Sequence, residues 1–359
     1  MENNSKAMRL SWVDTLRFLG IFAVYIGHFG TLAGRSYPYV FSYHVSLFFF
    51  ASGFFAIPSK ETDLRSYVKK SIITVIVPYF IFNIIILAVW GIAYDLSAEQ
   101  LMPYVISVIF GIRNHIYPAG SLWFLPCLFL MKITYYALYK LTKKKWIVLL
   151  VSVAMMYLGR YIFPSEPSLF FNFDSMFRYI FFYALGSSLF PLINRLDYKE
   201  FSIPGKLLWW GTFAGVAILS AMIYYQRTYR LYAFLALGGV LELNRIVVPI
   251  ISIVLNVYLS FLLSRFSLLA DLGKNTLFLC GNEQLIRYLL PSALSILGIE
   301  MATTTPLAVY IYSFTLLVCV SYILRPIEKK LFPILDFEKT GPLWQLDNKK
   351  SDSHKDMDN

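Results

Sequence analysis

The sequence predicts an all-α polytopic membrane protein with about ten transmembrane helices and both termini in the cytoplasm. Hydrophobic residues make up 58% of the 359 residues and charged residues only 15%, whereas soluble domains contain about 45–50% and about 25%. Aromatic residues reach 18%, which suits rings that anchor helix ends at membrane interfaces. The net charge of +11 is therefore assigned to cytoplasmic loops and not to nucleic-acid binding.

Each predicted span is a mostly apolar run, because a membrane helix needs about 17–25 such residues. The runs lie at 12–32, 41–57, 72–94, 119–139, 146–163, 174–193, 206–225, 246–264, 275–297 and 305–325. The shorter stretch 231–243 is predicted to be interfacial or re-entrant. An eleventh crossing there would place the last two basic clusters outside, against the positive-inside rule.

Basic residues set the predicted orientation, because ten spans place every basic cluster on the cytoplasmic side. The clusters are Lys6 and Arg9; Lys60, Arg65, Lys69 and Lys70; Lys140 and Lys143–Lys145; Arg195, Lys199 and Lys206; Arg265 and Lys274; and Arg325, Lys329 and Lys330. Residues 1–333 are predicted to form one membrane domain. Residues 334–359 are polar and predict a disordered cytoplasmic tail. The three cysteines lack C-x-x-C spacing, so we expect no disulfide framework and no metal site.

The first predicted span carries three ionisable residues, Asp14, Arg17 and His28. On an α-helix these three share one face, since His28 lies about 20° from Arg17 after eleven residues and about 16 Å along the axis. Asp14 and Arg17 are spaced i,i+3 and could neutralise each other, which is a purely structural role. His28 has no such partner nearby, and an intramembrane histidine indicates a functional site.

The second predicted span carries His44 near its outer end, at a depth similar to that of His28. Ser52 and Gly53 follow and allow close helix packing. Near the end of the chain, Glu283 and Arg287 lie four residues apart in an apolar run. They could form a self-neutralising pair, or Glu283 could contact a substrate.

Four motifs in chain order resemble integral-membrane acyltransferase family 3, in particular its sugar O-acetylase branch. The first is Arg17-x10-His28. The others are YHVSLFFFASGF at 43–54, SLWFLPCLFL at 121–130 and LGKNTLFLCGNEQLI at 272–286. The resemblance covers about residues 10–330. It implies a multi-pass protein of a bacterial plasma or inner membrane that moves an acetyl group from cytoplasmic acetyl-CoA to a cell-surface glycan or its lipid-linked precursor.

The chain also departs from the family pattern. Lys69 and Lys70 stand before Pro78 where relatives carry arginines, and they are our candidates for binding the donor. Glu283 stands where many relatives have a histidine, and Ser46 replaces a proline. These departures leave open an inactive relative that serves as an assembly partner.

The residue types suit acetyl transfer to a hydroxyl. A neutral imidazole can take the hydroxyl proton, so His28 is the expected general base, with His44 as its helper or as the base itself. Arg17 offers fixed donors to a phosphate or to the thioester oxygen. Asp14, Arg113, His115, Trp123 and Glu283 are candidates for substrate contacts, although Arg113 and His115 would equally fit a solvated loop. A transporter or flippase of a polysaccharide precursor is the alternative, but no internal repeat is visible.

Overall fold

The computed structural model describes residues 10–58, 62–164, 166–196, 201–225, 241–298 and 305–335, and throughout these ranges every regular element is helical. The chain divides into two compact units. Unit 1 comprises the described residues of Met1–Leu10, Phe55–Phe181 and Ser321–Asn359, and unit 2 those of Ser11–Phe54 and Phe182–Val320. The all-α prediction is confirmed.

Seven helical segments of the described residues are long and apolar enough to cross a membrane. They are Leu64–Ala93, Gly120–Thr142, Lys145–Ile162, Phe170–Ile193, Ile203–Tyr224, Arg245–Leu263 and Pro306–Leu331. Each corresponds to one predicted span, so the membrane assignment is confirmed while the count of ten is not. Residues 231–240 of the stretch predicted to be interfacial, the first nine residues and most of the predicted tail lie outside the described residues, while 241–243 begin a helix that continues to Leu263.

The other three predicted spans are shorter or broken. The span predicted at 12–32 is helix α1 (Ser11–Gly27), followed by the 3-10 helix η1 (Gly30–Ala33). The span at 41–57 contains only the ten-residue helix α3 (His44–Gly53), and 275–297 is split into α14 (Thr276–Gly281) and α15 (Glu283–Ile296). These three segments carry His28, His44 and Glu283.

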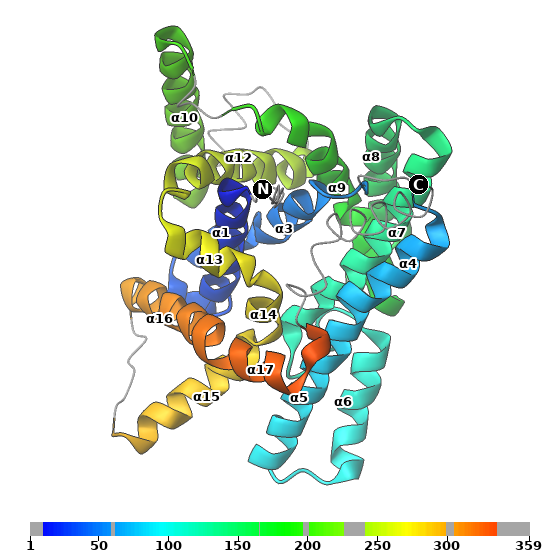
Figure 1. The fold of residues 1–359 in the computed structure, drawn as a ribbon, viewed down its shortest axis with the longest axis vertical. Coiled ribbons are helices and arrows are strands. Elements are labelled where there is room, and N and C mark those ends of the chain that lie inside the picture. Colours follow the sequence, from blue (N-terminus) through cyan, green and yellow to red (C-terminus); the bar gives the residue numbers. More distant parts are fainter. Residues whose placement is uncertain are drawn as a thin grey trace, which may run out of the picture. The chain divides into compact units, whose positions relative to one another are not determined.

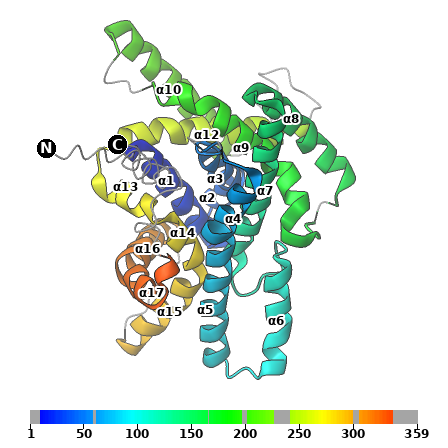
Figure 2. The same cartoon turned by 45° about the vertical axis from the view of Figure 1, so that its right-hand side comes forward.

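Unit 1 is built on long helices that follow one another in the chain. Helix α4 (Leu64–Ser71) continues through a π-helical segment η2 (Ile72–Ile76) into α5 (Val77–Ala93), which packs beside α6 (Ala98–Phe110) (Figures 1 and 2). Asp63 caps α4, and hydrogen bonds from Ser66 hold the pKa of its carboxyl below the ordinary value. The remaining elements are η3 (Gly120–Trp123), α7 (Phe124–Thr142), α8 (Lys145–Ile162), η4 (Phe170–Asn172), the start of α9 (Phe173–Ile193), η6 (Val320–Leu324), α17 (Arg325–Leu331) and η7 (Pro333–Leu335).

Unit 2 is organised around α1, which packs against elements from both ends of the unit (Figures 1 and 2). Its neighbours include α2 (Ser36–Phe41), α3, α12 (Leu241–Leu263), α13 (Ser267–Lys274), α14 and α16 (Pro306–Cys319), while α10 (Ile203–Tyr224) packs on α12. Trp12 fixes the start of α1, because its ring stacks on Phe261 with a centroid distance of 4.8 Å and its Nε1 donates to Asn194 Oδ1 at 3.2 Å. The start of α1 is thus fixed by Trp12, and the rest of the helix packs against the other neighbouring helices.

Two glycine contacts permit the close packing of unit 2. A Cβ atom on Gly273 would lie 2.6 Å from the carbonyl carbon of Asp14, so α13 meets α1 backbone to backbone. A Cβ on Gly53 would lie 2.9 Å from the carbonyl carbon of Tyr183, and one on Gly186 would lie 2.8 Å from that of Phe50. The close approach predicted at Ser52-Gly53 is therefore confirmed for Gly53.

Candidate functional site

A buried carboxylate, Glu283, lies between the side chains of His28 and Arg287 in unit 2. Its Oε2 is 3.0 Å from His28 Nδ1, and its Oε1 is 3.1 Å from Arg287 Nη1. The Glu283 side chain is fully buried, whereas those of His28 and Arg287 are 23% and 22% exposed. The cluster therefore contains one fully buried carboxylate and two partly exposed side chains that contact it.

Local backbone breaks produce this arrangement. Helix α1 ends at Gly27, but the amide of His28 still donates to the Val24 carbonyl at 3.0 Å, so His28 keeps the helical register. Asn282 separates α14 from α15 and makes Glu283 the first residue of α15. Tyr25 donates its hydroxyl to the Leu279 carbonyl at 2.7 Å and ties α1 to α14. The end of α1 and the break between α14 and α15 are thus held close together, which brings His28 next to Glu283.

The His28 Nδ1 and Glu283 Oε2 atoms face each other at 3.0 Å, and both are buried without another hydrogen-bond partner among the described residues. Arg287 is held from its other side, since its guanidinium carbon lies 4.5 Å from the centre of the Phe29 ring. The Glu283–Arg287 pair expected from the i,i+4 spacing is confirmed.

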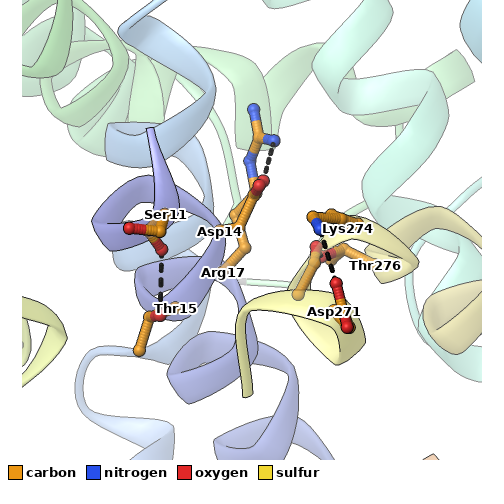
Figure 3. Close-up of polar contacts among 8 residues, drawn as sticks. Ser11, Asp14, Thr15, Arg17, Asp271, Lys274 and Thr276 are labelled. Atoms are coloured by element: carbon orange, nitrogen blue, oxygen red, sulfur yellow. Dashed lines mark hydrogen bonds and ion pairs between the residues drawn. The ribbon is translucent and has the colours of Figure 1, made fainter. Parts of the chain in front are cut away.

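Asp14 and Arg17 form the ion pair that their i,i+3 spacing predicts, with Nη1 of Arg17 3.2 Å from Oδ1 of Asp14 (Figure 3). The Asp14 side chain is 2% exposed and that of Arg17 is 29% exposed, so the guanidinium is the accessible half. Figure 3 also shows the neighbouring helix α13, where Lys274 pairs with Asp271. Arg17 is thus placed by a buried carboxylate while part of its side chain stays exposed.

His44 is buried and its ring is fixed by the backbone. Its Nδ1 lies 2.7 Å from the Val40 carbonyl oxygen. The Phe41 ring lies 4.9 Å from the His44 ring and 6.4 Å from the His28 ring, measured between centroids. His44 therefore lines the same aromatic cluster as His28, with Phe41 in ring contact with both.

The other predicted site residues belong to unit 1. Lys69 is exposed and Lys70 is half-buried, both on α4. Arg113 places its guanidinium carbon 4.9 Å from the centre of the Trp123 ring, and Trp123 is only 8% exposed. His115 is exposed in the loop before η3, as its solvated-loop interpretation predicts. One face of the Trp123 ring is thus covered by a cation of the same unit.

Asn172 organises the loop that carries Arg113, a role that the sequence did not indicate. Its side-chain Oδ1 accepts a hydrogen bond from the Arg113 amide at 2.6 Å, and its Nδ2 donates to the carbonyls of Gly111 and Trp123. Asn172 adopts a left-handed φ of 58°, which asparagine tolerates better than most residues. The positions of Arg113 and Trp123 therefore depend on this one buried side chain.

A second residue missed from the sequence is Lys132 of α7, which is 9% exposed inside a membrane-spanning helix. In the sequence, only its position as a lone charge in an apolar run could have pointed to it.

Among the described residues no group of three His, Cys, Asp or Glu side chains could hold a metal ion.

Comparison with known proteins gives the family. No curated protein and no solved structure matches the chain. A family model described as an acyltransferase domain matches residues 10–325, which include every residue of the His28–Glu283–Arg287 cluster and the Asp14–Arg17 pair. The chain is therefore a membrane acyltransferase that belongs to acyltransferase family 3.

Proposed function

We propose that this acyltransferase moves an acetyl group from cytoplasmic acetyl-CoA to a hydroxyl of a cell-surface glycan or of its lipid-linked precursor. The observation that carries the proposal is the His28–Glu283–Arg287 cluster, because it supplies a base with a carboxylate partner at 3.0 Å. A carboxylate beside Nδ1 favours the tautomer with its proton on that atom. This leaves Nε2 of His28 to accept a proton from the acceptor hydroxyl.

The transfer then needs no covalent enzyme intermediate. The acceptor oxygen loses its proton to His28 and attacks the thioester carbonyl carbon, forming the new C–O bond. The C–S bond breaks as the tetrahedral intermediate collapses, and the CoA sulfur takes the proton back from the imidazolium. Glu283 stabilises that imidazolium, and Arg287 keeps Glu283 ionised.

Arg17 is proposed to bind the donor, through the thioester oxygen or a phosphate. Its side chain pairs with Asp14 at 3.2 Å and is 29% exposed, and a guanidinium is suited to planar contacts with a phosphate or a carbonyl oxygen. Lys69 and Lys70 are proposed to contact the phosphates of acetyl-CoA, and His44 to support His28. Asp14, Arg113, His115 and Trp123 stay candidates for substrate contacts.

The test is a comparison of surface glycans from cells that carry wild type, His28→Ala or no copy of the protein. Base-labile acetyl groups are scored by mass. His354→Ala, which lies outside the family match, is the matched control. We expect wild type and the control to add acetyl mass and His28→Ala to equal the deletion at the same protein level.

Identical glycans from all four strains would contradict the proposal for that glycan. A transport role would then be examined with the purified protein in vesicles, by precursor movement without release of CoA thiol. Release of CoA thiol that depends on an added glycan supports transfer and argues against transport.

A further inference from the structure

Lys132 is a buried lysine within a membrane-spanning helix of unit 1. It lies on α7, in the apolar segment Gly120–Thr142, and is only 9% exposed. A charged side chain at such a position is costly, and it is retained mainly where it faces the protein interior and serves a ligand or a partner. The neighbours of Lys132 therefore decide what it serves.

Aromatic rings hold the lysine from one side. Its Nζ lies 5.8 Å from the centre of the Tyr67 ring, a distance at which a cation is attracted to the ring face. Tyr67 stacks on Tyr136 at 4.1 Å between centroids, and both hydroxyls donate to backbone carbonyls, of Ala56 and Thr62 respectively. The ring pair is thus fixed, and it fixes the position of the ammonium group.

No carboxylate neutralises Lys132 among the described residues of the chain. Among the described residues, the charged group that acts on Lys132 is Lys70, another cation, which lies on α4 one turn beyond Tyr67. A π-helical turn follows at Ile72–Ile76, and Thr74 there donates its hydroxyl to the Lys70 carbonyl at 2.9 Å. Such turns are frequent at functional sites. Lys70 and Lys132 are thus two cations close to one π-helical turn, and within the described part of the chain the buried Lys132 has no anionic partner.

We propose that Lys132, together with Lys70, binds a phosphate group that enters unit 1 from the cytoplasmic side. Ammonium groups bind phosphate as point charges, and a bound phosphate would supply the negative charge that Lys132 lacks. The Leu64 end of α4 is the predicted cytoplasmic end. Two sources could supply this phosphate: acetyl-CoA and the headgroup of an anionic lipid. The acetyl-CoA source rests on the proposed function.

Binding measurements on purified protein in phosphatidylcholine nanodiscs test the proposal. The variants are Lys132→Met, which keeps length and apolar packing, Lys132→Arg, which keeps the charge, and Lys140→Met, the matched control on the same helix. Titration calorimetry uses CoA and pantetheine, which has no phosphate. We expect Lys132→Met to weaken CoA binding about tenfold or more, as for a lost charged hydrogen bond. Pantetheine binding and the melting temperature should stay unchanged.

A lipid arm separates the two sources of phosphate. Phosphatidylglycerol retained by each variant is counted by native mass spectrometry. Loss of this lipid in Lys132→Met, with unchanged CoA affinity, assigns the site to a lipid phosphate. Unchanged affinity for both ligands overturns the proposal and leaves Lys132 held by the Tyr67 ring alone.

The measurement also separates this inference from the proposed function, because binding does not require transfer. A protein that binds CoA through Lys132 but transfers no acetyl group would refute the proposed function and keep the phosphate site. If wild type acetylates a glycan but Lys132→Met changes neither CoA nor lipid binding, the proposed function stands and the phosphate site is refuted.

Discussion

Glu283→Gln is the sharpest test of the His28–Glu283–Arg287 cluster, because it removes one charge and keeps the side-chain shape. With 3.0 Å between the His28 and Glu283 atoms, an imidazolium and a carboxylate attract each other by about 5 kcal/mol at an effective dielectric constant of about 20. A glutamine dipole recovers part of this energy, so about 2–3 kcal/mol of transition-state stabilisation is lost. The expected fall in kcat is about 30- to 150-fold.

The assay is the release of CoA thiol from acetyl-CoA in the presence of a glycan that wild type acetylates. KM for acetyl-CoA should change little, because Glu283 acts through His28 and not on the donor. Glu99→Gln is the matched control, since Glu99 is exposed on α6 in unit 1. A Glu283→Gln enzyme that folds normally and keeps kcat within about threefold of wild type would refute the assigned role.

Three further predictions concern neighbouring features. Arg17→Lys should raise KM for acetyl-CoA about tenfold, because an ammonium cannot replace the planar donors of guanidinium; unchanged donor affinity in calorimetry would argue against donor binding by Arg17. Gly273→Ala should destabilise the protein by about 1–3 kcal/mol, since its Cβ would lie 2.6 Å from the Asp14 carbonyl carbon; the melting temperature in detergent measures this, and an unchanged value contradicts the close contact. Asn172→Ala should lower the free energy of unfolding by about 3 kcal/mol, because it removes three hydrogen bonds of about 1 kcal/mol each. Asn172→Gly, which keeps the left-handed φ accessible, separates the bonds from the backbone strain in the same assay.

Local pairs were readable from the sequence, whereas the contact that joins the site was not. The spacing of Asp14 and Arg17, and of Glu283 and Arg287, is enough to predict both ion pairs. The contact between His28 and Glu283 spans 255 positions and depends on how α1 packs against α13 and α14. From the sequence, Glu283 could be predicted to pair with Arg287 or to contact a substrate, but not to lie beside His28.

Trp123 shows a second limit of sequence reasoning. Its position before an apolar span suggested a ring on which a sugar could stack. Whether a ring face is open depends on tertiary neighbours, and Arg113 lies over this ring at 4.9 Å. That contact rests on Asn172, which is 59 positions from Arg113 and is held in a left-handed conformation that apolar patterning does not register.

Three predicted spans are not continuous long helices, and these are the spans that carry His28, His44 and Glu283. One physical cause accounts for both the breaks and the ionisable residues. A continuous membrane helix satisfies its own backbone and turns most side chains toward neighbours or lipid, so it gains little from polar groups. Each break leaves backbone groups that need partners inside the protein. In unit 2 polar side chains supply some of them: Tyr25 bonds to the Leu279 carbonyl and His44 lies against that of Val40. Hydropathy measures only the apolar content of these segments, so it predicted continuous spans where the helices are in fact short or interrupted near the ionisable residues. In this protein the departures from simple span prediction therefore coincide with the candidate site.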